Sequence, residues 1–131
     1  MTEDQMPYTH GNVHWSELAT HDVDAALEYY KSVCGWDIQT EEMPEGPYHM
    51  GLVAGVPVVG IFDIKQMEGM QNLPSHWMTY LAVDDVDAAV QTTADTGGQV
   101  MKSGFDVPQV GRIAIVADPS GAVIGLIQPA D

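Results

Sequence analysis

A glutamate, a histidine and a tyrosine stand on two stretches that read as β-strands. Successive strand side chains point to opposite faces, so Trp15 and Glu17 share one face. For the same reason His76, Met78 and Tyr80 share a face on the second stretch. A carboxylate that faces inward needs a hydrogen-bonding partner, and a desolvated carboxylate suits a general base. Glu17, His76 and Tyr80 are therefore the candidate catalytic residues.

The remaining four histidines and the single cysteine are weaker candidates. His10 and His21 favour solvated or capping roles, whereas His49, on another predicted strand, is ambiguous. Strand alternation points His14 to the face opposite Trp15. Cys34 excludes an internal disulfide and reads as a small buried hydrophobic residue, because no base is placed next to it. No nucleophile elbow, phosphate loop or clustered zinc spacing occurs in the chain.

The elements that must position these residues follow from a five-residue phrase that occurs twice. Asp22-Val23-Asp24-Ala25-Ala26 returns as Asp85-Val86-Asp87-Ala88-Ala89, displaced by 85 − 22 = 63 residues. A strand residue before the phrase and a glycine after it repeat at the same offset, and the last strand repeats at offset 65: Leu18 and Leu81, Gly35 and Gly98, and stretches 55–61 and 120–126. The sequence therefore predicts two tandem copies of one module.

Each module is predicted to contain a strand, a helix and three further strands. In the first module the strands are 13–18, 36–40, 48–53 and 56–64, and the helix begins at Asp22 and stops at Gly35. In the second module the strands are 76–83, 99–103, 112–117 and 122–128, with a helix at 86–94 that Gly97-Gly98 ends. The tetrad Asp118-Pro119-Ser120-Gly121 predicts a type I turn. The modules span 12–64 and 76–129 within one domain, 1–131, and 65–75 connects them; methionines in this connector could also cover a ligand.

Composition restricts the partners. The 131 residues carry four Lys plus Arg against 19 Asp plus Glu, a formal net charge of −15. Such a field repels phosphate backbones and anionic lipid, so neither nucleic acid nor a membrane surface is an expected partner. The carboxylates are dispersed, which indicates a solvated acidic surface that suits either a saline habitat or simple solubility. No secretory signal is expected at the N-terminus, so the expected compartment is the cytoplasm.

The duplicated module carries further motifs at fixed places. Tyr29-Tyr30 precedes Gly35-Trp36, the stretch 83–87 reads Val-Asp-Asp-Val-Asp, and Gly111-Arg112 precedes the run 118–122. With these motifs the chain, from Val13 to Pro129, resembles the vicinal oxygen chelate superfamily, which includes glyoxalases, bleomycin-resistance proteins and extradiol dioxygenases. The resemblance implies an α+β fold of two tandem βαβββ modules whose curved sheets enclose a shared cleft.

Metal-dependent members of that superfamily place ligands on the first and last strand of each module. Carried onto this chain, those four positions are Trp15, Gly60, Met78 and Gly125. None of these side chains suits a hard or borderline divalent ion, so we expect neither a metal nor another cofactor. The two glycines would leave open volume where glutamates stand in such members. The expected ligand-binding residues are Trp15, Glu17, Tyr48, Gly60, His76, Met78, Tyr80 and Gly125.

The favoured function is binding or sequestration of a small organic molecule in a metal-free cleft. One alternative is an enzyme of the same superfamily: a lyase, isomerase or dioxygenase that is metal-dependent at other ligands, or metal-free with Glu17 acting beside Tyr80 or His76. Another is a partner-binding domain whose cleft is filled. The resemblance and the exposed sheet edges together predict a homodimer.

Overall fold

The computed structural model describes residues 8–107 and 110–130. The described residues divide into two compact units, one formed by 15–78 and the other by 8–14, 79–107 and 110–130. The boundary falls inside the first and fifth strands, β1 (Val13–Thr20) and β5 (His76–Ala82).

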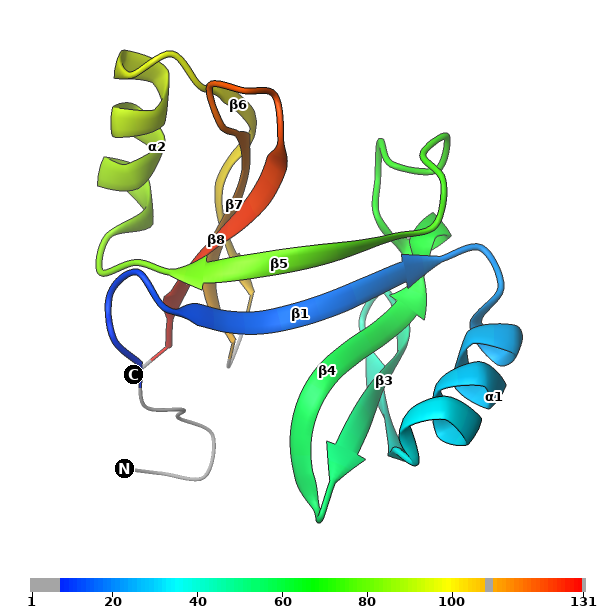
Figure 1. Ribbon diagram of the computed structural model, residues 1–131. Helices are drawn as coiled ribbons and strands as arrows, with labels where there is room; N and C mark the ends of the chain where they lie inside the picture. The colour runs from blue at the N-terminus through cyan, green and yellow to red at the C-terminus, as the bar shows by residue number, and fades with distance from the viewer. Residues whose placement is uncertain (1–7, 108–109, 131) are drawn as a thin grey trace. The chain divides into compact units, whose positions relative to one another are not determined.

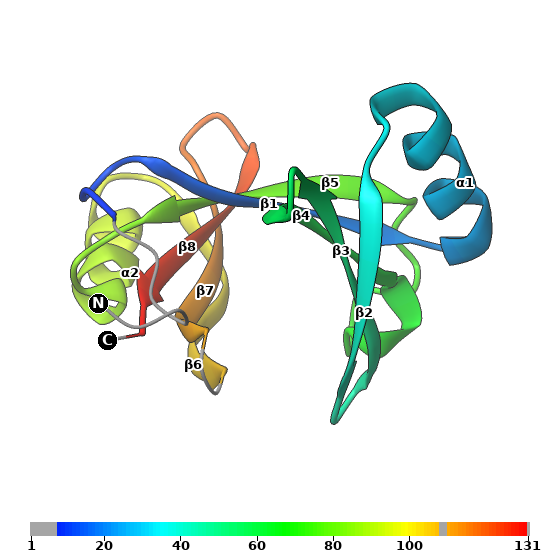
Figure 2. The same ribbon diagram turned by 90° about the horizontal axis from the view of Figure 1, so that it is seen from below.

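The first unit holds the elements of the first module (Figures 1 and 2). After β1 come α1 (Val23–Cys34), β2 (Asp37–Met43), β3 (Gly46–Val53), β4 (Val56–Asp63) and a 3-10 turn, Ile64–Gln66. The strands lie in the order β2-β3-β4-β1, with β4 antiparallel to β3 and parallel to β1. A strand, a helix and three further strands are therefore present in the predicted order.

The second unit repeats this arrangement with β5, α2 (Val86–Asp95), β6 (Gln99–Val107), β7 (Gly111–Ala117) and β8 (Val123–Pro129). Its strand order is β5-β8-β7-β6, and β8 is parallel to β5. Helix α2 packs against β6, β7 and β8, as Figure 1 shows. The α+β class and the two βαβββ modules are confirmed, whereas the shared cleft and the single-domain organisation stay predictions.

The pairing register repeats along with the element order. Glu17 pairs with Gly60 in the first module, and Tyr80 pairs with Gly125 in the second. The first-strand partners differ by 80 − 17 = 63 residues and the last-strand partners by 125 − 60 = 65. These are the two offsets of the sequence repeat, so Glu17 corresponds to Tyr80 and Gly60 to Gly125.

Both helices begin where the sequence predicts, and α1 also ends as predicted, whereas α2 runs one residue further, to Asp95. Asp22 Oδ1 accepts a hydrogen bond from the Ala25 amide at 3.0 Å, and Asp85 Oδ1 accepts one from the Ala88 amide at 3.1 Å. Each carboxylate thereby satisfies an N–H that has no partner inside the helix. Gly35 ends α1 at φ 71°, a left-handed conformation that glycine adopts without strain.

The predicted turn between β7 and β8 is also present. The Gly121 amide donates to the Asp118 carbonyl at 2.9 Å, and the Asp118 carboxylate accepts from the amides of Ser120 and Ala122. The hydrogen bond from the Ser120 hydroxyl, followed by those from the two amides, lowers the pKa of Asp118.

Some boundaries and one packing expectation were wrong. Strand β2 starts after Trp36 and runs on to Met43, and β6 extends to Val107 through two register irregularities. Ile64 belongs to the 3-10 turn rather than to β4. Cys34, which the sequence predicts to be buried, is exposed at the last position of α1, because no residue of this helix is fully buried against the sheet. Pairing with neighbouring strands determines where a strand ends, and a single sequence does not reveal that pairing.

The buried core lies on the sheets of the two units. In the first unit Ala19, Phe62 and Ile64 form one cluster, and in the second the members are Val83, Val86, Ala114, Val116 and Leu126. None of the described helices is long and apolar enough to cross a membrane.

Candidate functional site

Three polar side chains of the first unit form a continuous hydrogen-bonded chain. The Trp15 indole Nε1 donates to the Tyr48 hydroxyl at 3.0 Å, and that hydroxyl donates to Glu17 Oε2 at 2.8 Å. All three side chains are half-buried. Strand β1 supplies the tryptophan and the glutamate from one face, as alternation predicts, and β3 supplies the tyrosine. The inward carboxylate therefore has the partner that the sequence required without identifying it.

Gly60 makes room for this arrangement. A Cβ built on Gly60 would collide with the hydroxyl and ring of Tyr48. The expectation that this glycine leaves open volume is therefore wrong, because the phenol of Tyr48 fills the space. The Tyr48 ring also lies against the Phe62 ring, with centroids 6.2 Å apart. The ring contact and the hydrogen bonds together hold the Tyr48 hydroxyl over Gly60 of β4.

Gly125 is filled in a similar way in the second unit. A Cβ there would collide with the ring of Tyr80, which is 5% exposed. The predicted opening at Gly125 is wrong for the same physical reason. In both modules a tyrosine ring covers the glycine of the last strand, although the two tyrosines come from different strands.

The second module lacks the polar chain of the first. At the two repeat offsets the counterparts of Trp15 and Glu17 are Met78 and Tyr80, and the counterpart of Tyr48 is Ile113. Met78, Tyr80 and Ile113 are all buried. The hydrogen-bonded chain of indole, phenol and carboxylate therefore belongs to the first module and is not repeated at the equivalent positions of the second.

The candidate histidines have local partners. His76 is half-buried, and its Nδ1 lies 2.8 Å from the Pro74 carbonyl oxygen. This contact is typical of a structural histidine, and a role of His76 in ligand binding stays a prediction. The side chain of His14 lies edge-on to the Tyr8 ring at 6.4 Å, and burial lowers the pKa of His14.

The four positions that the resemblance assigns to metal ligands do not fit a metal in this chain. Trp15 is a donor in the polar chain, Met78 is buried, and the space beside both glycines holds tyrosine rings. Across residues 8–107 and 110–130, no three or more His, Cys, Asp or Glu side chains converge in a way that could hold an ion.

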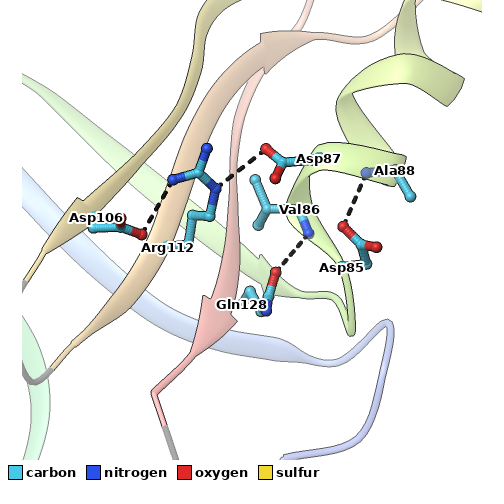
Figure 3. Close-up of polar contacts among 7 residues, drawn as sticks. All are labelled: Asp85, Val86, Asp87, Ala88, Asp106, Arg112 and Gln128. Carbon is cyan, nitrogen blue, oxygen red and sulfur yellow. Dashed lines mark hydrogen bonds and ion pairs between the residues drawn. The ribbon is translucent and has the colours of Figure 1, made fainter.

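Sequence reasoning missed a second polar cluster, which Figure 3 shows in the second unit. The Arg112 guanidinium donates through Nε to Asp87 and through Nη1 to Asp106, both at 3.1 Å. Hydrogen bonds with Asp106 and then Asp87 raise the pKa of Arg112. This arginine ties the first turn of α2 to β6 and β7. The available signals were the Gly111-Arg112 motif and the rarity of basic residues, neither of which identified the two aspartates.

Gln128 completes the same cluster. Its Oε1 accepts from the Val86 amide at 3.0 Å, next to the Asp85 cap (Figure 3). A shallow hollow of about 360 Å³ adjoins the cluster, and its lining includes Asp106, Arg112 and Gln128. Since the arginine is already paired with two carboxylates, these contacts fasten the helix to the sheet.

Comparison with known proteins gives one family. The model of the Glyoxalase/Bleomycin resistance protein/Dioxygenase superfamily matches residues 12–126. CFP32 of Mycobacterium bovis, which carries a provisional glyoxylase name, is 38% identical over 123 residues, covering 92% of this chain and 47% of that protein. The anthracycline biosynthesis protein DnrV of Streptomyces peucetius is 26% identical over 123 residues, covering 86% of this chain and 45% of its own. The chain thus spans about half the length of the curated relatives it matches.

Solved structures share the fold. Methylmalonyl-CoA epimerase of Streptomyces coelicolor, in complex with 2-nitronate-propionyl-CoA, superposes with a TM-score of 0.62 at 21% identity, over 94% of this chain and 100% of the epimerase. At that identity the likeness concerns the fold alone.

Proposed function

We propose, from the premise that the chain belongs to the Glyoxalase/Bleomycin resistance protein/Dioxygenase superfamily, that it binds a small organic molecule against the face formed by Trp15, Tyr48 and Glu17. The observation that carries the proposal is the hydrogen-bonded chain Trp15–Tyr48–Glu17, which the second module lacks. Half-buried polar groups beside an aromatic ring are typical of small-molecule sites.

The asymmetry between the modules supports this proposal. If these positions served only for packing in both modules, the first module could carry the same kind of buried residues that the second module has there. The first module instead keeps a carboxylate half-buried, and the tyrosine that lies over Gly60 holds this carboxylate by a hydrogen bond. Burying polar groups costs free energy even when they are paired, so such an arrangement favours a functional role.

A ligand screen tests the proposal. Thermal-shift measurements against a broad panel of uncharged, cationic and anionic metabolites should identify a compound whose binding isothermal calorimetry then quantifies. Tyr48→Phe should weaken that compound at least tenfold. Tyr29→Phe is the matched control, because Tyr29 is 58% exposed on α1 and should leave affinity unchanged. A ligand that binds both variants as tightly as the parent would place the site elsewhere.

An enzymatic role is the second candidate, and one observation favours it. The Tyr48 hydroxyl fixes Glu17 Oε2 in one orientation, and catalysis by a general base needs such positioning. In this version Glu17 removes a proton from the bound molecule without a metal, and His76 of the same unit is the assisting group. Solvent hydrogen exchange into a bound ligand, followed by NMR and abolished by Glu17→Gln, would support catalysis over binding alone.

We also propose that the chain forms a homodimer. Several large side chains of the first unit are exposed, among them Val33 at 62%, Val56 at 59% and Trp77 at 41%. Surfaces of this kind mark association sites when they are contiguous. Light scattering at micromolar concentration should return about twice the chain mass of 14.2 kDa. A mass near that of one chain would contradict the proposal.

A further inference from the structure

Glu17 and Tyr48 define what a ligand must bring to their face of the first unit. The tyrosine hydroxyl already accepts from Trp15 and donates to Glu17, so its proton is directed at the carboxylate. An ionised carboxylate only accepts hydrogen bonds. A group that docks against Glu17 must therefore carry a donor, such as a hydroxyl, an N–H or an ammonium.

The sheet around Glu17 offers no positive charge. Strands β1 to β4 are fully described and contain no lysine or arginine. Their carboxylates are Glu17, Asp37, Glu41, Glu42 and Asp63. An anion brought to this sheet would meet repulsion, because charges about 4 Å apart interact appreciably even near a protein surface.

Three of the four basic residues of the chain already have partners within the described residues. Lys31 lies 3.9 Å from Glu28 on exposed α1, and Lys102 lies over the Phe105 ring at 4.2 Å. Arg112 is paired with two aspartates. Lys65 is exposed in the 3-10 turn that follows β4.

The helix N-termini are also closed to anions. A helix start is a common place for phosphate because its N–H groups lack partners. Here Asp22 and Asp85 occupy those starts as caps, and Asp24 and Asp87 add negative charge in the first turns. In α2 the side chain of Gln128 accepts from one more N–H (Figure 3).

We infer that the ligand of the Trp15–Tyr48–Glu17 face is an uncharged or cationic molecule with a hydrogen-bond donor for Glu17 and a flat apolar part for Trp15, and that phosphate esters and acyl-CoA thioesters are excluded. This inference rests on the function proposed above and narrows its ligand class. It separates this chain from the epimerase whose fold it shares, since that epimerase holds an acyl-CoA compound.

Three dyes with the same ring system test the inference. 1,4-Dihydroxyanthraquinone is uncharged, one derivative carries an aminoalkyl ammonium group, and another carries a sulfonate. Calorimetric titration should give affinities for the ammonium and neutral dyes at least about tenfold above that of the sulfonate, a factor that corresponds to about 1.4 kcal/mol. Coenzyme A is titrated alongside as the phosphate-bearing probe and should not bind.

Salt and substitution separate a local effect of Glu17 from the overall field. At about 1 M sodium chloride the Debye length falls to about 3 Å, so a preference due to distant charges would vanish while a contact preference remains. Glu17→Gln should reduce the ammonium-to-sulfonate ratio to within about threefold. Glu28→Gln, the matched control on α1, should leave the ratio unchanged because Glu28 is 78% exposed and paired only with Lys31.

The possible failures are distinguishable. Binding of the sulfonate or of coenzyme A as tightly as the ammonium dye would overturn the inference, and if Tyr48→Phe also weakened that binding the proposed function would stand. If the preference for the ammonium dye over the sulfonate dye vanishes in high salt or survives Glu17→Gln, the role of Glu17 is overturned. If no dye binds the parent protein, the inferred ligand class is wrong, and the broad screen decides separately whether the face binds anything.

Discussion

Removing one oxygen atom from Tyr48 tests the core of the site. In Tyr48→Phe the ring can keep its place against Phe62 and over Gly60, while the hydroxyl between Trp15 and Glu17 is lost. The substitution therefore changes hydrogen bonding with little change in packing. If the hydrogen-bonded chain holds the site as described, its loss should lower the free energy of unfolding.

The expected magnitude follows from the two bonds. A neutral hydrogen bond contributes about 0.5–1.5 kcal/mol and one to a charged group about 1.5–3 kcal/mol, which together bound the loss at about 4.5 kcal/mol. Because the three side chains are only half-buried, water can replace part of what is lost. We therefore expect Tyr48→Phe to reduce stability by about 1–3 kcal/mol.

Urea denaturation of five proteins measures the effect. With a slope of about 2 kcal/mol per molar urea, a loss of 2 kcal/mol moves the midpoint by about 1 M. The parent, Tyr48→Phe, Glu17→Gln and the double variant form a double-mutant cycle, in which residues in contact couple by about 0.5–3 kcal/mol. Tyr29→Phe on exposed α1 is the control for the chemistry of the change and should stay within about 0.5 kcal/mol.

Two results would refute this reasoning. Tyr48→Phe that costs no more than Tyr29→Phe would mean that the hydroxyl adds nothing to the folded state. A coupling energy near zero would mean that Tyr48 and Glu17 act independently, and the description of the site as one connected chain would fail.

The remaining predictions concern packing, pH and salt. Ile64→Ala should cost about 2–5 kcal/mol in urea denaturation, since Ile64 is 0% exposed, and a loss under 1 kcal/mol would contradict its place in the core. Gly125→Ala should cost about 1–3 kcal/mol because the new methyl group meets the Tyr80 ring; an unchanged midpoint would mean that the ring moves freely. Burial lowers the pKa of His14. The contribution of His14 to stability is therefore complete above the unfolded pKa of about 6.5 and is lost as pH falls through that value toward the folded pKa. His14→Gln should flatten the dependence of stability on pH in that range, and an unchanged dependence would show that His14 does not contribute to it. With a net charge of −15, the melting temperature should rise from low to about 1 M sodium chloride, and a flat or falling dependence would argue against charge repulsion as a significant cost.

The sequence by itself determined the fold at the level of elements. Repeated aspartate caps, alternating strands and glycine stops are local signals, and each acts through contacts within a few residues. They predicted both helices and the order of all eight strands, and the two repeat offsets of 63 and 65 reappear in the pairing of Glu17 with Gly60 and of Tyr80 with Gly125. Alternation alone placed Trp15 and Glu17 on a common face.

Only the tertiary structure decided how the site is made. Tyr48 lies 31 residues from Glu17 in sequence, and the register between β3, β4 and β1 brings its hydroxyl to the carboxylate. The same register turns Gly60 from an expected opening into the position that admits the tyrosine. A glycine is visible in a sequence, but which side chain fills the space beside it depends on the neighbouring strand. Strand pairing is a long-range contact, so its consequences could not be predicted from local patterns.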